Sequence, residues 1–115
     1  MKLGANSKEH REIGERWANN KGVLLHYLDT GAFAAYNLVP IVFVPGALGS
    51  AENYVREMES LTPRRCLAVS LRGAGKSEAP EKGYTFEDHV FDIEAIIQES
   101  ELNSFCLMAY SMGVP

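Results

Sequence analysis

The last serine of the chain, Ser111, stands in a pattern that is typical of a catalytic nucleophile. Ala109 and Gly113 lie two residues to either side of it, so the pattern is A-x-S-x-G, one small residue away from G-x-S-x-G. That motif marks a nucleophile elbow, in which a buried strand turns sharply into a helix and the serine hydroxyl stands at the end of the strand. The strained backbone needs small flanking residues, and Ala109 and Gly113 meet that need. The chain ends at Pro115, before such a helix could follow.

A second stretch is similar to a phosphate-binding loop. Residues 70–77 read SLRGAGKS and depart from G-x-x-x-x-G-K-[ST] only at Ser70. The lysine and serine of such a loop open a helix whose amides hold the phosphates, whereas the proline- and glycine-containing segment 78–83 does not favour a helix. Glu78 also stands where G-x-G-x-x-G needs its third glycine. We therefore favour a tight surface turn, with Arg72 in a structural role, over nucleotide binding.

Histidines and cysteines do not cluster in the sequence. His10, His26 and His89 lie far apart, beside charged or turn residues, and no Cys/His group has metal-ligand spacing. We therefore expect neither a metal nor another cofactor. Cys66 and Cys106 each lie in an apolar run, and we expect both to be buried free thiols rather than a disulfide or redox pair.

Length, composition and charge narrow the possible functions. The chain has 115 residues, 46% of them hydrophobic and 23% charged, which is ordinary for one globular domain. The net charge is −4 and the lysines and arginines are scattered, so neither nucleic acid nor an anionic membrane is an expected partner. Residues 1–9 hold no apolar signal region, and no run is long enough to span a membrane. A cytoplasmic location is the default expectation.

The elements that would position these residues alternate between strands and helices. Short apolar runs predict strands near 23–29, 41–44, 66–69 and 105–109. Capping residues followed by apolar stripes predict helices near 50–61 and 86–101. The expected buried face of the first helix is Tyr54, Met58 and Leu61, and that of the second is Phe86, Val90, Ile93 and Ile97. This alternation is typical of an α/β domain with a mostly parallel sheet and helices on both faces.

Two interpretations fit the residues before the first of these strands. Residues 7–12 could open a short polar helix. Alternatively, residues 15–19 form an edge strand that pairs with the strand at 23–29 across the turn-like Asn20-Lys21-Gly22. We favour the antiparallel hairpin.

From about Glu15 to Gly113 the chain resembles the N-terminal half of an α/β-hydrolase. The similar segments are 22–31 (GVLLHYLDTG, the second strand), 41–46 (IVFVPG, the third strand and the following turn), 71–77 (LRGAGKS, the Arg-Gly-x-Gly-x-Ser loop), 83–93 (GYTFEDHVFDI, the entry to helix B) and 110–113 (YSMG, the elbow). Their shared order and spacing carry the resemblance.

The resemblance implies the roles of individual residues. Ser111 matches the nucleophile of acyl transfer, and the backbone N–H groups of Met112 and Ala47 match the oxyanion hole. The implied substrate is a small-molecule ester, thioester, amide or related acyl compound. A serine at the nucleophile position argues against the dehalogenase and epoxide-hydrolase branches, which use aspartate there.

The family's strand order, 1-2-4-3-5, has two further implications. The strands that end at Val44 and Ala109 would be neighbours, so the two oxyanion donors could converge on one oxygen. Cys66 and Cys106 would lie on strands that are not adjacent, and at ~4.8 Å per strand that spacing exceeds the reach of a disulfide.

The sequence also departs from the family's pattern. Pro45 replaces the usual histidine and Ser70 the usual aspartate. In this family the acid and the histidine follow the serine along the chain, but every aspartate and histidine here precedes Ser111. His89 and Asp92 fall on the predicted second helix, and we expect capping or surface roles for them. A serine without a base is a poor nucleophile, so the chain alone is expected to be inactive.

We therefore interpret residues 1–115 as a single, truncated hydrolase domain that supplies the nucleophile and the oxyanion hole. The expected partner is the missing C-terminal half of the fold, in the same or a second chain. The strand at 105–109 would be an exposed hydrophobic edge, which favours self-association. Two alternatives stay open: a non-catalytic interaction or relic protein of the same fold, and a nucleotide binder resembling P-loop proteins.

Overall fold

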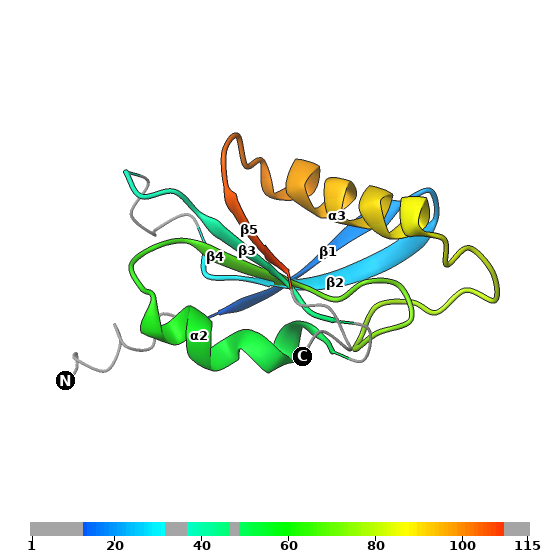
Figure 1. The fold of residues 1–115 in the computed structure, drawn as a ribbon, viewed down its shortest axis with the longest axis horizontal. Coiled ribbons are helices and arrows are strands. Elements are labelled where there is room, and N and C mark those ends of the chain that lie inside the picture. The colour runs from blue at the N-terminus through cyan, green and yellow to red at the C-terminus, as the bar shows by residue number, and fades with distance from the viewer. Residues whose placement is uncertain (1–12, 32–36, 47–48, 110–115) are drawn as a thin grey trace.

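A five-stranded mixed sheet with helical segments on both sides makes up the described part of the chain (Figure 1). The computed structural model describes residues 13–31, 37–46 and 49–109. Its elements are β1 (Gly14–Asn20), β2 (Val23–Asp29), β3 (Ile41–Val44), the 3₁₀ turn η1 (Ala51–Tyr54), α2 (Val55–Ser60), β4 (Cys66–Val69), α3 (Phe86–Ser100) and β5 (Cys106–Ala109).

The strand order is β1-β2-β4-β3-β5, the order that the resemblance implied. β3 pairs in parallel with β4 on one side and with β5 on the other. β2 runs antiparallel to both β1 and β4. Because right-handed crossovers return β4 and β5 to the same direction as β3, the three chain segments that leave these strands do so at one edge of the sheet.

The N-terminal hairpin is confirmed. β1 and β2 pair along their whole length, from Gly14 opposite Asp29 to Asn20 opposite Val23. The two turn residues, Lys21 and Gly22, have φ angles of 52° and 95°, the positive values that a tight hairpin turn needs. The alternative of a polar helix at 7–12 lies outside the described residues.

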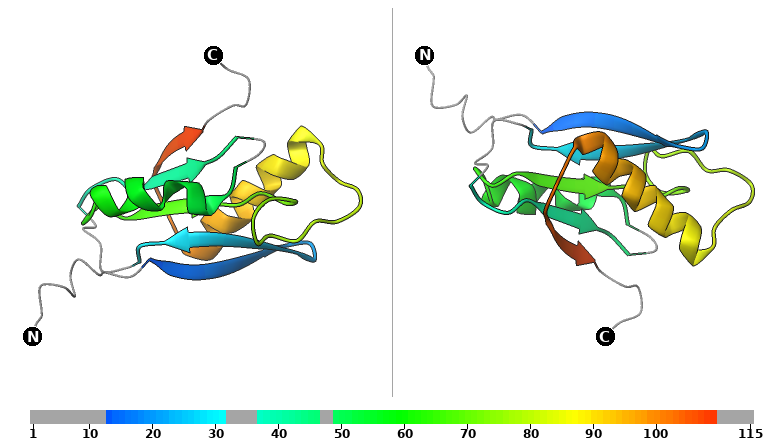
Figure 2. Two further views of the ribbon diagram at one scale, coloured as in Figure 1. Left: turned by 90° about the horizontal axis from the view of Figure 1, so that it is seen from below. Right: turned by 90° about the horizontal axis from the view of Figure 1, so that it is seen from above.

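Each face of the sheet has its own apolar core. α3 covers one face, where Ile96 packs with a cluster that includes Leu25, Val42 and Leu67. η1 and α2 cover the other face (Figure 2), and on that face Tyr54 and Met58 pack with Phe43. The predicted fold class, an α/β sheet with helices on both faces, is confirmed.

The helix predicted near 50–61 is two elements, a 3₁₀ turn that continues into α2. Its expected face is correct, because Tyr54 and Met58 are buried and Leu61 packs against them. The expected face of the later helix is partly wrong. Phe86 is 78% exposed, and the buried side chains of α3 are Asp92, Ile96 and Ser100. The predicted face differs from the observed one because the spacing of apolar residues assigns a charged residue such as Asp92 to the solvent side of a helix.

The expectation for the cysteines is half wrong. Both are free thiols, and β3 separates their strands as expected. Cys66 lies on the central strand β4 and is buried, but Cys106 is exposed. Its strand, β5, is the edge of the described sheet, and all 4 of its residues are exposed. An apolar run predicts a strand, but it cannot tell an edge strand from a central one.

Candidate functional site

The three residues expected to carry the chemistry, Ala47, Ser111 and Met112, lie outside the described residues. The structure does describe the two strands that lead to them. β3 and β5 are parallel neighbours, and their last residues, Val44 and Ala109, are partners in the register. Ligands of such sheets bind beyond the carboxyl ends of the strands. The candidate site is therefore the region beyond Val44 and Ala109.

The segment after β3 is held by tight local contacts. Gly49 N donates to Gly46 O at 3.0 Å, and Ser50 N donates to the side-chain oxygen of Asn53 at 2.8 Å. A Cβ atom on Gly49 would stand only 2.8 Å from Cβ of Pro45 and 2.9 Å from Oδ1 of Asn53. Only glycine fits at position 49, so the ends of this loop are closely fixed. Pro45, the departure from the family's histidine, is part of this contact.

Ser70, the other departure, follows β4 directly and is fully buried. Its hydroxyl oxygen accepts a hydrogen bond from Ala51 N at 2.8 Å, which ties the end of β4 to the start of η1. Its own N–H donates to His26 O at 3.0 Å, and its carbonyl accepts from the hydroxyl of Ser77 at 2.6 Å. Ser70 thus connects the loop after β4 to the start of η1, which follows the loop after β3.

The loop that is similar to a phosphate-binding sequence is a closed turn. Gly73 N donates to Glu78 O at 2.8 Å, and Glu78 N donates to Leu24 O at 2.9 Å, which fastens the loop to β2. The next helix, α3, begins only at Phe86, so no helix opens at Lys76 and Ser77. The amino group of Lys76 instead lies 2.9 Å from the carboxylate of Glu15. These contacts agree with the predicted surface turn and argue against a phosphate site.

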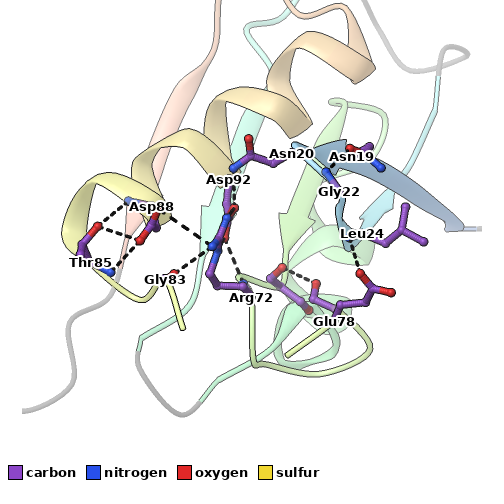
Figure 3. A network of polar contacts seen from close by, with 12 residues as sticks. Asn19, Asn20, Gly22, Leu24, Arg72, Glu78, Gly83, Thr85, Asp88 and Asp92 are labelled. Atoms are coloured by element: carbon purple, nitrogen blue, oxygen red, sulfur yellow. Dashed lines mark hydrogen bonds and ion pairs between the residues drawn. The ribbon is translucent and has the colours of Figure 1, made fainter. Parts of the chain in front are cut away.

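Arg72 and Asp92 form a buried ion pair that connects this loop to α3 (Figure 3). Nε and one terminal nitrogen of Arg72 donate to the two oxygens of Asp92 at 2.9 and 2.7 Å, and Arg72 N donates to the same carboxylate at 3.2 Å. The other terminal nitrogen donates to Gly83 O at 2.8 Å. Asn20 donates to Asp92 at 2.9 Å. The bond to Asp92 raises the pKa of Arg72.

The expected roles of the helix residues need one correction. Asp92 is neither a cap nor a surface residue: it is fully buried and paired with Arg72, because the helix presents it to the loop after β4. The residue that closes the capping box with Thr85 is Asp88 (Figure 3). His89 is half-buried, with its ring 6.3 Å from that of Tyr84. Both oxygens of Asp92 are thus engaged by Arg72.

His26 is a buried residue that the sequence analysis did not single out. Its imidazole is fully buried, and neither ring nitrogen has a hydrogen-bond partner among the described residues. Two carboxylates approach it: Glu15 lies 3.4 Å from Nε2, and Glu52 lies 3.9 Å from Nδ1. The rings of Trp17 and His26 form a T-shaped pair, with their centroids 5.0 Å apart. No signal in the sequence distinguishes this histidine from a surface one, because its strand alternates apolar and polar residues only weakly.

A cavity of about 490 Å³ lies at the other end of the strands, away from the carboxyl ends of β3 and β5. It is lined by residues that include Tyr27, Asp29, Arg65 and Ser100, from the end of β2, the start of β4 and the end of α3. Arg65 is already paired with Asp29 at 2.7 Å there. The cavity is therefore not part of the candidate site beyond Val44 and Ala109.

Within the described ranges, no helix has the length and apolar character needed to cross a membrane.

Comparisons with known proteins agree with this geometry. The sequence model described as "alpha/beta hydrolase fold" matches residues 39–113. The AB hydrolase superfamily protein YisY of Bacillus subtilis is 33% identical over 76 residues, covering 64% of this chain and 28% of that protein. A haloalkane dehalogenase of Bradyrhizobium diazoefficiens is 33% identical over 104 residues, covering 89% of this chain and 32% of that protein.

A solved structure shows the same arrangement. The crystal structure of the epoxide hydrolase VrEH1 from Vigna radiata superposes with a TM-score of 0.75 at 27% identity, over 89% of this chain and 33% of that chain. The chain thus spans about a third of the length of the relatives that it matches. With the family's sequence pattern over 39–113 and its strand order in the sheet, the chain belongs to the alpha/beta hydrolase fold family.

Proposed function

We propose that this chain supplies the nucleophile and the oxyanion hole of a serine hydrolase that acts on an ester, thioester, amide or related acyl substrate. One observation carries the proposal: β3 and β5 are parallel neighbours whose last residues, Val44 and Ala109, are register partners. Ala47 and Ser111 follow these two strand ends by three and two residues in the sequence. The nucleophile and both oxyanion donors are therefore expected on adjacent loops.

The chemistry follows from these roles. The hydroxyl oxygen of Ser111 attacks the acyl carbon while a base takes its proton, and the carbonyl oxygen becomes an oxyanion. The N–H groups of Ala47 and Met112 donate to that oxyanion, and the loss of one such donor typically costs about a hundred- to a thousandfold in kcat. The oxyanion then collapses and expels the leaving group, which takes up the proton from the base. The base next deprotonates a water that attacks the acyl-serine ester, and its proton returns to the oxygen of Ser111 as the acid product leaves.

The base is not expected within these 115 residues, since no histidine follows Ser111. Because the chain spans about a third of its relatives, we propose that the acid and the histidine come from a further polypeptide segment that completes the fold. The isolated chain is then inactive.

Relatives named haloalkane dehalogenase and epoxide hydrolase share the fold, so the reaction class needs a separate argument. The resemblance gives those branches an aspartate nucleophile, whose carboxylate is already charged at neutral pH. This chain has Ser111 at that position. A serine hydroxyl with an oxyanion hole beside it fits attack on a carbonyl carbon, and we therefore propose acyl transfer.

A serine-directed fluorophosphonate tests the proposal. In the assembled hydrolase, meaning this chain together with the segment that supplies acid and base, the reagent is expected to modify Ser111, located by peptide mass spectrometry. Turnover of an aryl ester is expected to disappear in Ser111→Ala, and the chain alone is expected to show none. An assembled protein in which Ser111 stays unlabelled would favour the non-catalytic alternative, and ester turnover by the isolated chain would contradict the missing-base argument.

A further inference from the structure

The imidazole of His26 stands between two acidic side chains that come from different elements. Its Nε2 lies 3.4 Å from a carboxylate oxygen of Glu15 on β1, and its Nδ1 lies 3.9 Å from one of Glu52 on η1. The His26 side chain is fully buried, whereas those of Glu15 and Glu52 are 51% and 43% exposed. Each nitrogen of a buried ring therefore faces a carboxylate that water can still reach.

Carboxylates on both ring nitrogens suit only one protonation state of an imidazole. An ionised carboxylate only accepts hydrogen bonds, and a neutral imidazole has one N–H donor and one bare nitrogen. A neutral His26 would therefore turn a lone pair towards one of the two carboxylates. Neither ring nitrogen has a hydrogen-bond partner among the described residues, and burial makes such unmet polar atoms costly. A protonated ring has a donor on each nitrogen and a positive charge, so protonation turns both contacts into ion pairs.

The charges around the ring also favour a cation. On the loop after β4, the amino group of Lys76 lies 2.9 Å from the second carboxylate oxygen of Glu15, and Glu78 accepts a hydrogen bond from a backbone N–H of β2. The bond to Lys76 lowers the pKa of Glu15, so this carboxylate stays charged at a pH where a histidine takes up its proton. Glu15, Glu52 and Lys76 together carry one net negative charge, which a positive ring neutralises. This offsets part of the cost of burying the charge.

The backbone holds His26 at a fixed point of the sheet. His26 N donates to the hydroxyl oxygen of Ser77 at 2.8 Å, and His26 O accepts from Ser70 N at 3.0 Å. On the other side, His26 is the register partner of Trp17 on β1. The ring thus lies where the β1–β2 hairpin meets η1, which packs on β2, β3 and β4. A change of charge on this ring acts on both of these elements at once.

We propose that His26 is a pH-sensitive clamp: when it takes up a proton from solvent, it pairs with Glu15 and Glu52 and ties the β1–β2 hairpin to η1. A histidine in an unfolded chain takes up its proton near pH ~6.5. Ion pairs that form only with the protonated ring therefore contribute fully to stability below that pH, and their contribution is lost as the pH rises and the folded chain releases the proton.

Urea unfolding of the 115-residue chain at about pH 5.5 and about pH 8.5 tests the clamp, with every variant at one protein concentration. Glu52→Gln is expected to lower the folding equilibrium constant about three- to tenfold at the acid pH, an effect between those of an exposed and a buried ion pair. At the alkaline pH it should act no more than its control. The control is Glu59→Gln, which removes the same charge from an exposed position of α2.

Trp17 reports the charge of His26 directly. It is the only tryptophan in the sequence, and its ring forms the T-shaped pair with His26. Protonation places a cation against the indole, which quenches its fluorescence. We expect the emission of the folded chain to fall as the pH is lowered, in wild type and in His89→Gln, whose ring lies beside Tyr84 instead. The fall should be absent in His26→Gln. Should that variant fail to fold, Glu52→Gln is expected to move the fluorescence transition to lower pH.

Three results would overturn the clamp. The first is a stability loss in Glu52→Gln that is the same at both pH values or no larger than that of Glu59→Gln in acid. The second is a Trp17 emission that does not change with pH in wild type. The third is a Trp17 transition that persists unaltered in His26→Gln or, where only Glu52→Gln folds, one that keeps its wild-type midpoint.

Discussion

Arg72 and Asp92 place two opposite charges where the loop after β4 meets α3. Three donors from Arg72, including its backbone N–H, reach the carboxylate of Asp92. The arginine of the Arg-Gly-x-Gly-x-Ser loop therefore connects the loop after β4 to α3.

Glu15 and Lys76 form an ion pair of similar length, but both side chains are about half exposed. Water screens such a pair, which makes it a weak contributor to stability.

We expect Asp92→Asn to lower the free energy of unfolding by roughly 3–5 kcal/mol, because the Arg72 guanidinium would stay buried without its counter-charge. Glu15→Gln, which removes the same charge from the exposed pair, should leave it nearly unchanged. Urea unfolding followed by circular dichroism at pH 7 measures both. An Asp92→Asn loss no larger than that of Glu15→Gln would show that the buried pair does not hold the loop.

The two cysteines should differ sharply in reactivity. Burial raises the pKa of the Cys66 thiol to about 11, so almost none of it is thiolate at pH 8. Cys106 is exposed on β5. A disulfide reagent at pH 8 is therefore expected to modify Cys106 quickly and Cys66 only after unfolding in guanidinium. Peptide mapping of the native protein that finds Cys66 modified as fast as Cys106 would contradict the burial of β4.

At the scale of elements, the sequence predicts a feature correctly where one residue type determines the local backbone geometry. The sequence predicts the hairpin turn at Lys21-Gly22, the capped start of the helix near 86 and the apolar run of β3, and the structure has all three. The exposure of Cys106 and the burial of Asp92 were not, because each depends on which element lies alongside. For the candidate site, the strand order followed from the family resemblance, whereas the link from Ser70 to Ala51 needed three-dimensional contacts.

The cap of α3 gives a pH-dependent prediction. Hydrogen bonds from Thr85 lower the pKa of Asp88. A lowered pKa in the folded state means that the ionised cap stabilises the fold above the unfolded value of about 3.9, and that this stabilisation is lost as the pH falls through the folded value. We therefore expect Asp88→Ala to lower the melting temperature at pH 6 and the gap from wild type to close towards pH 3. A gap that does not narrow at acid pH would exclude the charged cap.

At the scale of the whole molecule, the described sheet is covered unevenly. α3 packs against β1 and β2, and η1 lies against β2, β3 and β4. Among the described strands, β5 is paired with β3 alone. Leu107 is 48% exposed and Met108 44% exposed. Because successive residues of a strand point to opposite faces, both faces of β5 are open to contact. This surface is where we expect the completing segment of the hydrolase to pack.

Without that segment, the 115-residue chain should self-associate through β5, since an exposed apolar edge strand is a template for pairing. Analytical ultracentrifugation is expected to show a mass that rises with concentration, and Met108→Lys should reduce the association. Val39→Lys, which adds the same charge at a position of similar exposure (49%) outside the strands, is the control. A chain that stays monomeric at all concentrations, or a control that acts like Met108→Lys, would contradict association through β5.

The most direct test of the account is to trap the acyl-enzyme. The assembled hydrolase is mixed with an activated aryl ester, quenched in acid within the first turnover, and digested for mass spectrometry. The account predicts one acyl group per chain on the peptide that contains Ser111, matched by a burst of the phenol product, and neither in Ser111→Ala. An acyl group on another residue, or a product burst that persists in Ser111→Ala, would contradict the assignment of Ser111 as the nucleophile.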